Sequence, residues 1–410
     1  MTISGQERLR VSERVRHLAK VGFALVLASG IAIPSAQAQK YTVIHNFTGG
    51  NDGALPRSTL IVDRAGNLYG TAGPVFKMSH AGSGWVYTPL FIFPGGYDGS
   101  GSGAAIAFGP DSSLYGTADG GDLQCSDGEG GGCGIVFNLK PPPTRPASFF
   151  SPWKETVLHA FAGRPSDGEF PWTGAIIFDR AGNLYGTTEF GGNSGNWGTV
   201  FKMTAYGGGW TESVIYNLAY GTNGPYSGVV MDSAGNLYGT TGDGTVIFEL
   251  SPYGDGWTFT DLHDFTGGLN DGGLAYGGLV FDSHGNLFGA TTTGGAHGGG
   301  VVYELTPSNG TWTYHIIYNL PNGGPFDSLT VDAAGNLYGA AQDGGSDSAG
   351  MVFKLSQSNG VWTLTDLHDF TFDTEWFPEG GVTLDANGNL FGTAKDGGAH
   401  GWGVVWEITP

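Results

Sequence analysis

Short apolar segments alternate along the chain with turns that are rich in glycine and aspartate. Within residues 278–320 four such segments follow one another, at 278–281, 286–291, 300–305 and 312–320. An Asp-x-x-Gly turn separates the first two segments, and a glycine-containing turn separates the last two. Segments of this length between such turns are typical of β-strands joined in hairpins. We name the four predicted strands a, b, c and d.

The turn between strands a and b belongs to a phrase that occurs seven times. It reads VDRAGNLYGTA from Val62 and FDSHGNLFGAT from Phe281. The leucines of the phrase are Leu68, Leu114, Leu184, Leu237, Leu287, Leu337 and Leu390. They recur about every 50 residues, apart from one interval of 70 that contains the insertion at 141–152. Four antiparallel strands in each of seven units predict an all-β fold, a seven-bladed β-propeller.

The two ends of the repeat array complement each other. The last unit stops at strand c, GVVWEITP, and the segment Lys40–Phe47 (KYTVIHNF) reads as a strand d without a unit of its own. We expect this N-terminal strand to complete the last blade and close residues 39–410 into a single ring. Closure would remove the two exposed sheet edges of an open array.

The first 38 residues have the pattern of a secretory signal peptide. Five basic residues precede the apolar run VGFALVLASGIAIP, and Ser35–Ala38 fits an A-x-A cleavage site. We expect cleavage after Ala38 and export to the extracellular space or the periplasm. The alternative is an uncleaved anchor, although the run is shorter than the roughly 20 residues of a comfortable span. We predict no membrane span in the mature chain.

Composition and charge narrow the possible functions. The 76 glycines and only 13% charged residues do not suit a helical domain. The 17 Lys+Arg and 37 Asp+Glu give a net charge of −20, which becomes −23 when the leader's five basic and two acidic residues are removed. Such a surface repels nucleic acid and anionic lipid, so we predict no nucleic-acid partner. Cys125 and Cys133 are expected to form a disulfide worth about 2–3 kcal/mol.

The repeat contains the phrase GNLYGTT, which is followed by GG, by GTVF and then by W, L and F. This pattern resembles the Gloeo/Verruco (GloVer) family of bacterial tandem repeats. The resemblance covers residues 40–410. It departs from the pattern at Asp111–Ser113, where the Gly-Asn pair is missing and that turn is weakened. The resemblance implies an exported repeat protein. It brings no established reaction and no catalytic residues.

Residues that recur in every unit are expected to serve the fold. Late in strand d, histidine and tyrosine interchange at one position, which indicates packing between blades around the rim rather than metal binding. The residues at this position are His45, His159, Tyr216, His263, Tyr318 and His368. The tryptophans that open strand d, and Trp406 in the last strand c, are expected to be packing residues as well.

The connections from d to a and from b to c are long and variable, and in a propeller they share one face. Tryptophans without counterparts in other units lie on them: Trp172, Trp197, Trp376 and Trp402. A tryptophan exposed in a glycine-rich loop can stack on a sugar ring, so we predict a ligand-binding surface here. The alternative is that each ring covers its own loop. His297 and His400, in the near-copies GGAHGGG and GGAHGWG, are further ligand-binding candidates.

The d-to-a loops also contain Asp52, Asp98, Asp167 and Asp271. Asp-Gly is first of all a turn signal, but a ring of carboxylates at the channel mouth could bind calcium or act as an acid–base pair. We predict no other cofactor and assign no catalytic residue.

The sequence therefore favours an exported, non-catalytic binding propeller that recognises a glycan or another surface polymer. The alternatives are an extracellular polysaccharide lyase, hydrolase or lactonase that uses these carboxylates, and a structural protein of the cell envelope. Fold alone does not choose among them. The oligomeric state is left open.

Overall fold

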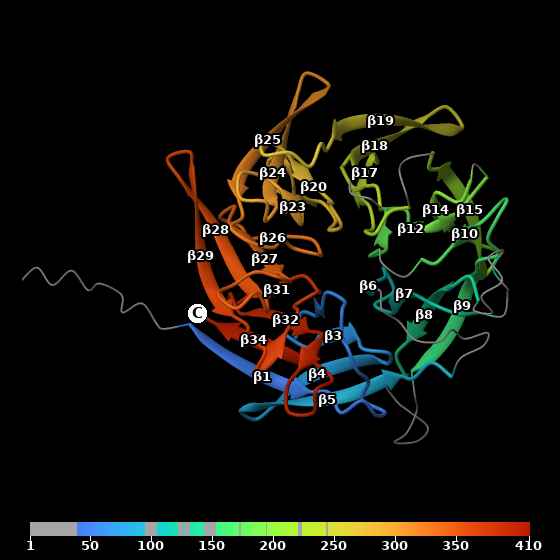
Figure 1. Ribbon diagram of the computed structural model, residues 1–410. Helices are drawn as coiled ribbons and strands as arrows, with labels where there is room; N and C mark the ends of the chain where they lie inside the picture. The colour runs from blue at the N-terminus through green and yellow to red at the C-terminus, as the bar shows by residue number, and fades with distance from the viewer. Residues whose placement is uncertain are drawn as a thin grey trace, which may run out of the picture. The chain divides into compact units, whose positions relative to one another are not determined.

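The computed structural model describes residues 39–94, 105–121, 125, 132–142, 153–171, 174–193, 195–219, 224–242 and 245–410. Every helix or strand within these ranges is a β-strand. Most of them form seven four-stranded antiparallel sheets, which surround a common axis with strand a innermost and strand d outermost (Figure 1). The predicted seven-bladed β-propeller is confirmed. In the described ranges, no helix is long and apolar enough to cross a bilayer.

The blades follow the chain. Blade 1 contains β2 (Ile61–Val62), β3 (Leu68–Thr71), β4 (Val75–Ala81) and β5 (Gly84–Phe91). Blade 2 contains β6 (Ala107–Phe108), β7 (Leu114–Ala118), β8 (Ile135–Lys140) and β9 (Lys154–Ala160). Blade 3 contains β11 (Ile177–Phe178), β12 (Leu184–Thr188), β14 (Thr199–Tyr206) and β15 (Gly209–Asn217). Blade 4 contains β16 (Val230–Met231), β17 (Leu237–Thr240), β18 (Val246–Tyr253) and β19 (Gly256–Asp264).

The last three blades repeat the arrangement. Blade 5 contains β21 (Val280–Phe281), β22 (Leu287–Ala290), β24 (Val301–Ser308) and β25 (Thr311–Asn319). Blade 6 contains β26 (Thr330–Val331), β27 (Leu337–Ala341), β28 (Met351–Ser358) and β29 (Val361–Asp369). Blade 7 contains β31 (Thr383–Leu384), β32 (Leu390–Ala394), β34 (Val404–Thr409) and β1 (Lys40–Asn46).

Blade 7 closes the ring as predicted. The N-terminal strand β1 pairs antiparallel with β34, from Lys40 opposite Thr409 to Asn46 opposite Val404. A side-chain bond adds to this closure, because Trp85 Nε1 in blade 1 donates to Glu407 in blade 7 over 3.2 Å. The N-terminal strand therefore covers the outer edge of β34, which the last blade would otherwise leave unpaired.

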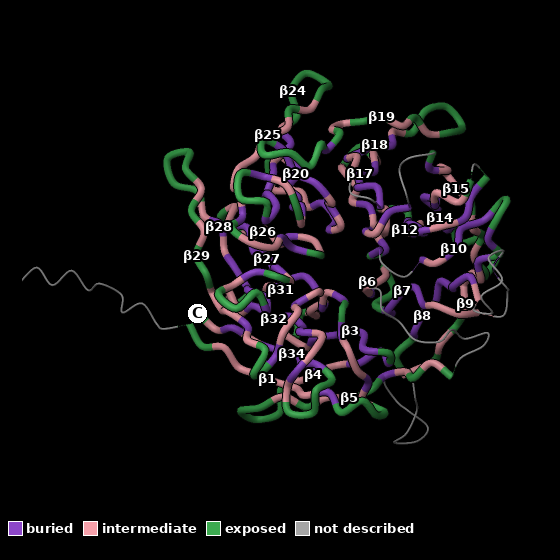
Figure 2. The backbone as a smooth tube through the Cα atoms, viewed as in Figure 1, coloured by how far each residue is buried: buried purple, intermediate pink, exposed green. Residues whose placement is uncertain are grey.

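The repeated Tyr-Gly or Phe-Gly of strand b makes room for an aromatic ring of strand c. A Cβ atom at Gly339 would lie 2.6 Å from the Phe353 ring, and one at Gly392 would clash with the indole of Trp406. Phe353 and Trp406 are both fully buried. Burial concentrates in strands b and c, whereas the tips of the c–d hairpins are exposed (Figure 2). Trp406 is thus a core residue, as the repeat predicts.

A bulge in strand d determines which neighbour its side chains meet. In blade 5, Tyr303 pairs with Ile316 and Val302 pairs with Tyr318, so Ile317 is an extra residue. Adjacent residues of strand c point to opposite faces, and the bulge therefore turns Tyr318 away from the face that carries Trp312. The same shift occurs in every blade. The opening tryptophan faces the preceding blade, and the histidine or tyrosine faces the next.

Three short ladders confirm that the d-to-a and b-to-c connections share a face. Strand β10 (Gly168–Glu169) pairs with β13 (Phe190–Gly191), and β20 (Gly272–Gly273) pairs with β23 (Thr293–Gly294). Strand β30 (Glu375–Trp376) pairs with β33 (Asp396–Gly397). We call this side of the propeller the loop face.

Candidate functional site

Four blade junctions join the late histidine of strand d to a carboxylate of the d-to-a loop that follows. The pairs are His45–Asp52 at 3.3 Å, His159–Asp167 at 3.1 Å, His263–Asp271 at 3.0 Å and His368–Glu375 at 4.0 Å. Strand d is the outermost strand, so Asp52, Asp167 and Asp271 do not form the ring that the sequence suggested at the channel mouth. Asp98 lies outside the described residues.

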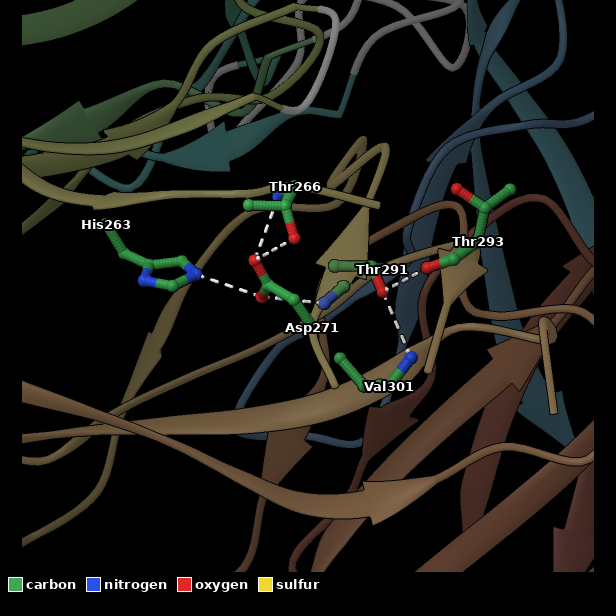
Figure 3. Close-up of polar contacts among 7 residues, drawn as sticks. His263, Thr266, Asp271, Thr291, Thr293 and Val301 are labelled. Atoms are coloured by element: carbon green, nitrogen blue, oxygen red, sulfur yellow. Dashed lines mark hydrogen bonds and ion pairs between the residues drawn. The ribbon is translucent and has the colours of Figure 1, made fainter. Parts of the chain in front are cut away.

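The junction between blades 4 and 5, the 4–5 junction, shows the arrangement in detail (Figure 3). Asp271 accepts hydrogen bonds from the Thr266 N–H at 2.8 Å, the Thr266 hydroxyl at 3.0 Å and the Gly272 N–H at 2.8 Å. Burial alone would raise the pKa of Asp271, but these bonds and His263 more than offset it and lower the pKa. Asp271 and His263 line an open depression of about 440 Å³. The carboxylate holds its loop closed against strand d.

An aromatic ring of the next blade covers the histidine at this junction. Tyr314 of β25 stacks on His263 with ring centroids 3.7 Å apart and planes 7° apart. Elsewhere Tyr87 stacks on His45 at 4.3 Å and Tyr41 stacks on His368 at 3.6 Å. The histidines are therefore packing residues, as predicted, and each also has an acidic partner.

The junction between blades 2 and 3, the 2–3 junction, departs from this pattern. The residue that occupies the place of Tyr314 is Glu212 of β15. Its carboxylate, the His159 ring and Asp167 each offer a ligand atom, and these atoms lie within 4.8 Å of one another. Burial, reinforced by Asp167 and opposed by His159, raises the pKa of Glu212 to about 7. Glu212 Oε1 is buried and has no hydrogen-bond partner among the described residues.

Three of the four predicted tryptophans are described, and all three lie on the loop face. Trp402 is 44% exposed and lies over Gly49, where a Cβ atom would approach its indole to 2.6 Å. Trp376 is half-buried and contacts Phe372, which is 52% exposed, at 5.9 Å between ring centroids. Trp197 is half-buried and folds over the nearby Gly195. Trp172 lies outside the described residues. Blade 7 thus presents an aromatic patch of Phe372 and Trp376, which we call the blade 7 patch, and Trp402 lies over Gly49 of the d-to-a loop that leads to blade 1.

His297 and His400 are exposed at the tips of b-to-c loops that have the same construction. The Ala296 N–H donates to Asn319 at 2.7 Å, and the Ala399 N–H donates to Asn46 at 2.7 Å. Each asparagine ends the strand d of the same blade, so it fixes the loop below the histidine. The structure keeps the two histidines apart, in blades 5 and 7.

A second set of residues converges near the axis. A buried apolar residue directly precedes strand a in each blade. In five blades, the residue three positions before it lies at the end of the d-to-a loop. These residues, which we call the inner ring, are Arg57, Tyr226, Tyr276, Phe326 and Glu379. The approach to strand a is tightly connected between blades, because Asp327 of blade 6 bonds to Thr59 of blade 1 and to the Gly381 N–H of blade 7.

Three of the five residues of the inner ring are aromatic. Tyr226 meets Tyr276 edge to face at 5.3 Å, and Tyr276 stacks on Phe326 at 4.9 Å with planes 23° apart. Phe326 is 39% exposed, and both tyrosines are half-buried. The three rings therefore form a continuous aromatic ledge across blades 4, 5 and 6.

The other two residues of the inner ring, Arg57 and Glu379, are charged. Glu379 accepts from Lys395 Nζ at 3.0 Å and from Gln342 Nε2 at 3.2 Å, and its second oxygen lies 3.4 Å from Arg57 Nε. The Glu379 side chain is 12% exposed, whereas that of Arg57 is 45% exposed. The guanidinium group thus keeps donors for a ligand while Glu379 holds its position.

Sequence reasoning missed the inner ring. A usable signal was present, because in these five blades one position of the repeat changes from arginine to tyrosine, phenylalanine and glutamate while the residue before it is always proline or alanine. Unique tryptophans drew attention to the loop tips instead. In this protein, a repeat position at which the residue type changes between units therefore predicts the site better than a residue that is unique to one loop.

The disulfide Cys125–Cys133 is present, with Cα atoms 5.1 Å apart, as predicted. The carbonyl oxygen of Cys133 accepts from the Phe170 N–H at 2.8 Å. The bridge therefore ties the b-to-c loop of blade 2 to the d-to-a loop that carries Asp167.

The repeat pattern agrees with sequence comparison. The family model of the Gloeobacter/Verrucomicrobia repeat matches residues 124–326 and 244–410. The chain belongs to this family, as the resemblance implied. No curated protein matches the chain in sequence.

Solved structures with the same architecture are distant in sequence. Virginiamycin B lyase from Staphylococcus aureus is 14% identical, and the match covers 91% of this chain and 99% of the lyase with a TM-score of 0.54. A Bacteroides uniformis protein assigned as a 6-phosphogluconolactonase is 15% identical, with 81% and 96% covered and a TM-score of 0.50. At these identities the likeness shows the fold alone.

Proposed function

We propose that this protein is an exported binding module that recognises a carbohydrate polymer on its loop face, with the inner ring as the main contact. The observation that carries the proposal is that equivalent positions of the d-to-a loops hold the aromatic ledge (Tyr226, Tyr276 and Phe326) in blades 4 to 6 and the polar cluster around Glu379 in the adjacent blade 7. Aromatic surface with a few fixed polar groups is the usual composition of a ligand site.

The chemistry of a sugar suits this arrangement. A pyranose has an apolar C–H face, which packs on an aromatic ring, and a rim of hydroxyl or carboxylate groups, which hydrogen-bond to polar side chains. Arg57 and Gln342 retain donors for that rim beside Glu379. The aromatic faces supply area at a low cost in side-chain entropy.

A polymer, rather than a single sugar, is supported by the second aromatic patch. Trp376 and Phe377 immediately precede Pro378 and Glu379, so the blade 7 patch and the inner ring are connected by one short segment. A chain of sugars that lies over the ledge would continue along this segment toward Trp376. The sequence pattern of a signal peptide agrees with a ligand outside the cytoplasm.

A glycan array with the mature chain tests the proposal, followed by titration calorimetry with the best ligand. The double variant Tyr276→Ala/Phe326→Ala is expected to bind at least about 10-fold more weakly, since each hot-spot aromatic contributes more than about 1 kcal/mol. Phe372→Ala, in the blade 7 patch, is expected to weaken binding to long chains more than to short oligosaccharides. The matched control is Tyr206→Ala/Tyr253→Ala, which removes two aromatic rings that are 83% and 78% exposed on the c–d hairpins.

Three outcomes would overturn the proposal. They are an array without any bound glycan, full affinity in the Tyr276→Ala/Phe326→Ala variant, and an equal loss in the hairpin control. The bound glycan is also incubated with the protein and analysed for shortened products. Cleavage of the glycan that requires the inner ring would show that the protein is an enzyme and not a binding module.

A further inference from the structure

The 2–3 junction gathers three metal-ligating side chains from three different segments. His159 comes from β9 in blade 2, Asp167 from the d-to-a loop, and Glu212 from β15 in blade 3. His159 Nε2 lies 3.1 Å from Asp167 Oδ2. Two ligand atoms at this separation, each about 2.1 Å from an ion, subtend an angle of about 95° at the ion, which suits transition-metal coordination.

The surrounding structure fixes the two ligands of blade 2. The His159 ring stands edge-on against Phe161 at 4.8 Å and 86°, so its orientation is set by the core. Asp167 is held by the Ala162 N–H at 2.8 Å and the Gly168 N–H at 2.7 Å. Supporting contacts of this kind preorganise metal ligands. Only Glu212 needs to adjust its side-chain torsions to reach an ion.

The related junctions show that packing does not require a carboxylate at the place of Glu212. Tyr314, Tyr41 and Tyr87 occupy the same place at other junctions and stack on the histidine. Glu212 instead brings a second carboxylate close to Asp167, with one oxygen buried and unpartnered among the described residues. Two carboxylates this close repel each other unless a proton or a cation lies between them.

We propose that His159, Asp167 and Glu212 bind one divalent first-row transition-metal ion, with Zn²⁺ as the ion that best suits one imidazole and two carboxylates. In this site the ion takes the place of the proton between His159 Nε2 and Asp167 Oδ2, and Glu212 supplies the third ligand. Water completes the coordination. The imidazole ligand disfavours Ca²⁺ and Mg²⁺, which take oxygen ligands.

The site connects the outer strands of two blades. An ion bound there would hold β9, the d-to-a loop and β15 together where the other junctions use a stacked tyrosine. Because the ion would bind the folded state and not the unfolded chain, it would raise the unfolding temperature, and the gain would grow with the logarithm of its concentration relative to Kd. This role is separate from glycan binding at the inner ring.

The mature protein is stripped with EDTA and titrated with Zn²⁺, Mn²⁺, Ca²⁺ and Mg²⁺ by calorimetry, and bound metal is measured by mass spectrometry. Wild type is expected to bind one Zn²⁺ per chain, with a higher melting temperature, and to prefer Zn²⁺ to Ca²⁺ by at least about 100-fold. Co²⁺ in place of Zn²⁺ reports coordination through its visible absorption. Glu212→Tyr introduces the residue that the 4–5 junction has at this place. This variant is expected to bind Zn²⁺ at least about 100-fold more weakly than wild type, which is more than the loss of a supporting contact causes.

Two further variants keep the test decisive. Glu212→Gln preserves size and is expected to lose the ion without loss of fold. Tyr314→Glu places the same three ligand types at the 4–5 junction, with His263 and Asp271, and is expected to bind a second ion. The proposal is overturned if wild type binds no Zn²⁺, or if Glu212→Tyr and Glu212→Gln both keep its stoichiometry and affinity.

Discussion

The 4–5 and 2–3 junctions have the same plan and differ most at the position that faces the histidine from the next blade. Both place a strand-d histidine about 3 Å from a loop aspartate, at 3.0 Å for His263–Asp271 and 3.1 Å for His159–Asp167. Each histidine also meets a phenylalanine two residues later, at 4.9 Å and 4.8 Å. In the 4–5 junction the next blade contributes Tyr314, and in the 2–3 junction it contributes Glu212.

The difference separates residues that serve the repeat from residues that depart from it. A tyrosine that stacks on the imidazole buries its aromatic ring between the blades. A glutamate at the same place buries a carboxylate oxygen beside another acid, which disfavours its charged form. The 2–3 junction also has the only disulfide, at one end of the loop that carries Asp167. This junction has exchanged aromatic packing for polar and covalent connections.

The largest expected effect comes from removing the aromatic ring of the 4–5 junction. Tyr314→Ala deletes the side chain that stacks on His263 and contacts Phe265 and Tyr303, so we expect a loss of about 3 kcal/mol in the free energy of unfolding. Urea denaturation in EDTA measures it. Glu212→Ala, measured in the same way, is expected to cost at most about 0.5 kcal/mol because the carboxylate oxygen has no partner to lose.

The comparison fails if the two alanine variants are equally destabilised without metal. In that case Glu212 would contribute to packing as Tyr314 does, and the junctions would be equivalent despite their chemistry. Excess Zn²⁺ provides the complementary arm. Zn²⁺ is expected to increase the difference in free energy of unfolding between wild type and Glu212→Ala. The difference between wild type and Tyr314→Ala is expected to stay the same.

The next effect in size concerns the covalent support of the 2–3 junction. The double variant Cys125→Ser/Cys133→Ser is expected to lose about 2–3 kcal/mol, the chain-entropy value for so short a loop. Limited proteolysis should show faster cleavage near residues 161–171, because Phe170 hydrogen-bonds to Cys133. Cleavage within residues 265–275, the equivalent loop of the 4–5 junction, serves as the internal control and should stay at the wild-type rate.

Periodicity was sufficient to predict the fold. The Asp-x-x-Gly-Asn turns and the buried Tyr-Gly or Phe-Gly positions repeat because each blade meets the same neighbours, so the sequence reports the packing directly. The pairing of Lys40–Asn46 with Val404–Thr409 followed from the missing strand d of the last unit. Trp406 was read correctly as a core residue for the same reason.

The sites were harder to predict because they depend on contacts between units. A contact such as His159 with Glu212 joins residues 53 positions apart in neighbouring blades, and the bulge that turns His159 toward blade 3 has no sequence signature. The inner ring likewise depends on convergence at the axis. The loop aspartates were recognised, but their partners in strand d were not, so they were expected at the channel mouth.

The smallest effect tests whether the aspartate of the 4–5 junction acts through its charge. The pKa of Asp271 is lowered in the folded state despite burial, since the N–H groups of Thr266 and Gly272 and His263 favour the carboxylate. Its stabilisation is therefore present above the unfolded pKa of about 3.9 and is lost as the pH falls through the lower folded value.

Asp271→Asn turns an amide N–H₂ toward one of these donors and is expected to cost about 1–2 kcal/mol at neutral pH. The difference from wild type should shrink below about pH 4, whereas Asp255→Asn, in the exposed c–d hairpin of the same blade, should show no such trend. A cost that stays constant down to pH 2 would show that Asp271 acts through shape alone, and the histidine–acid pair would then be part of the packing at both junctions.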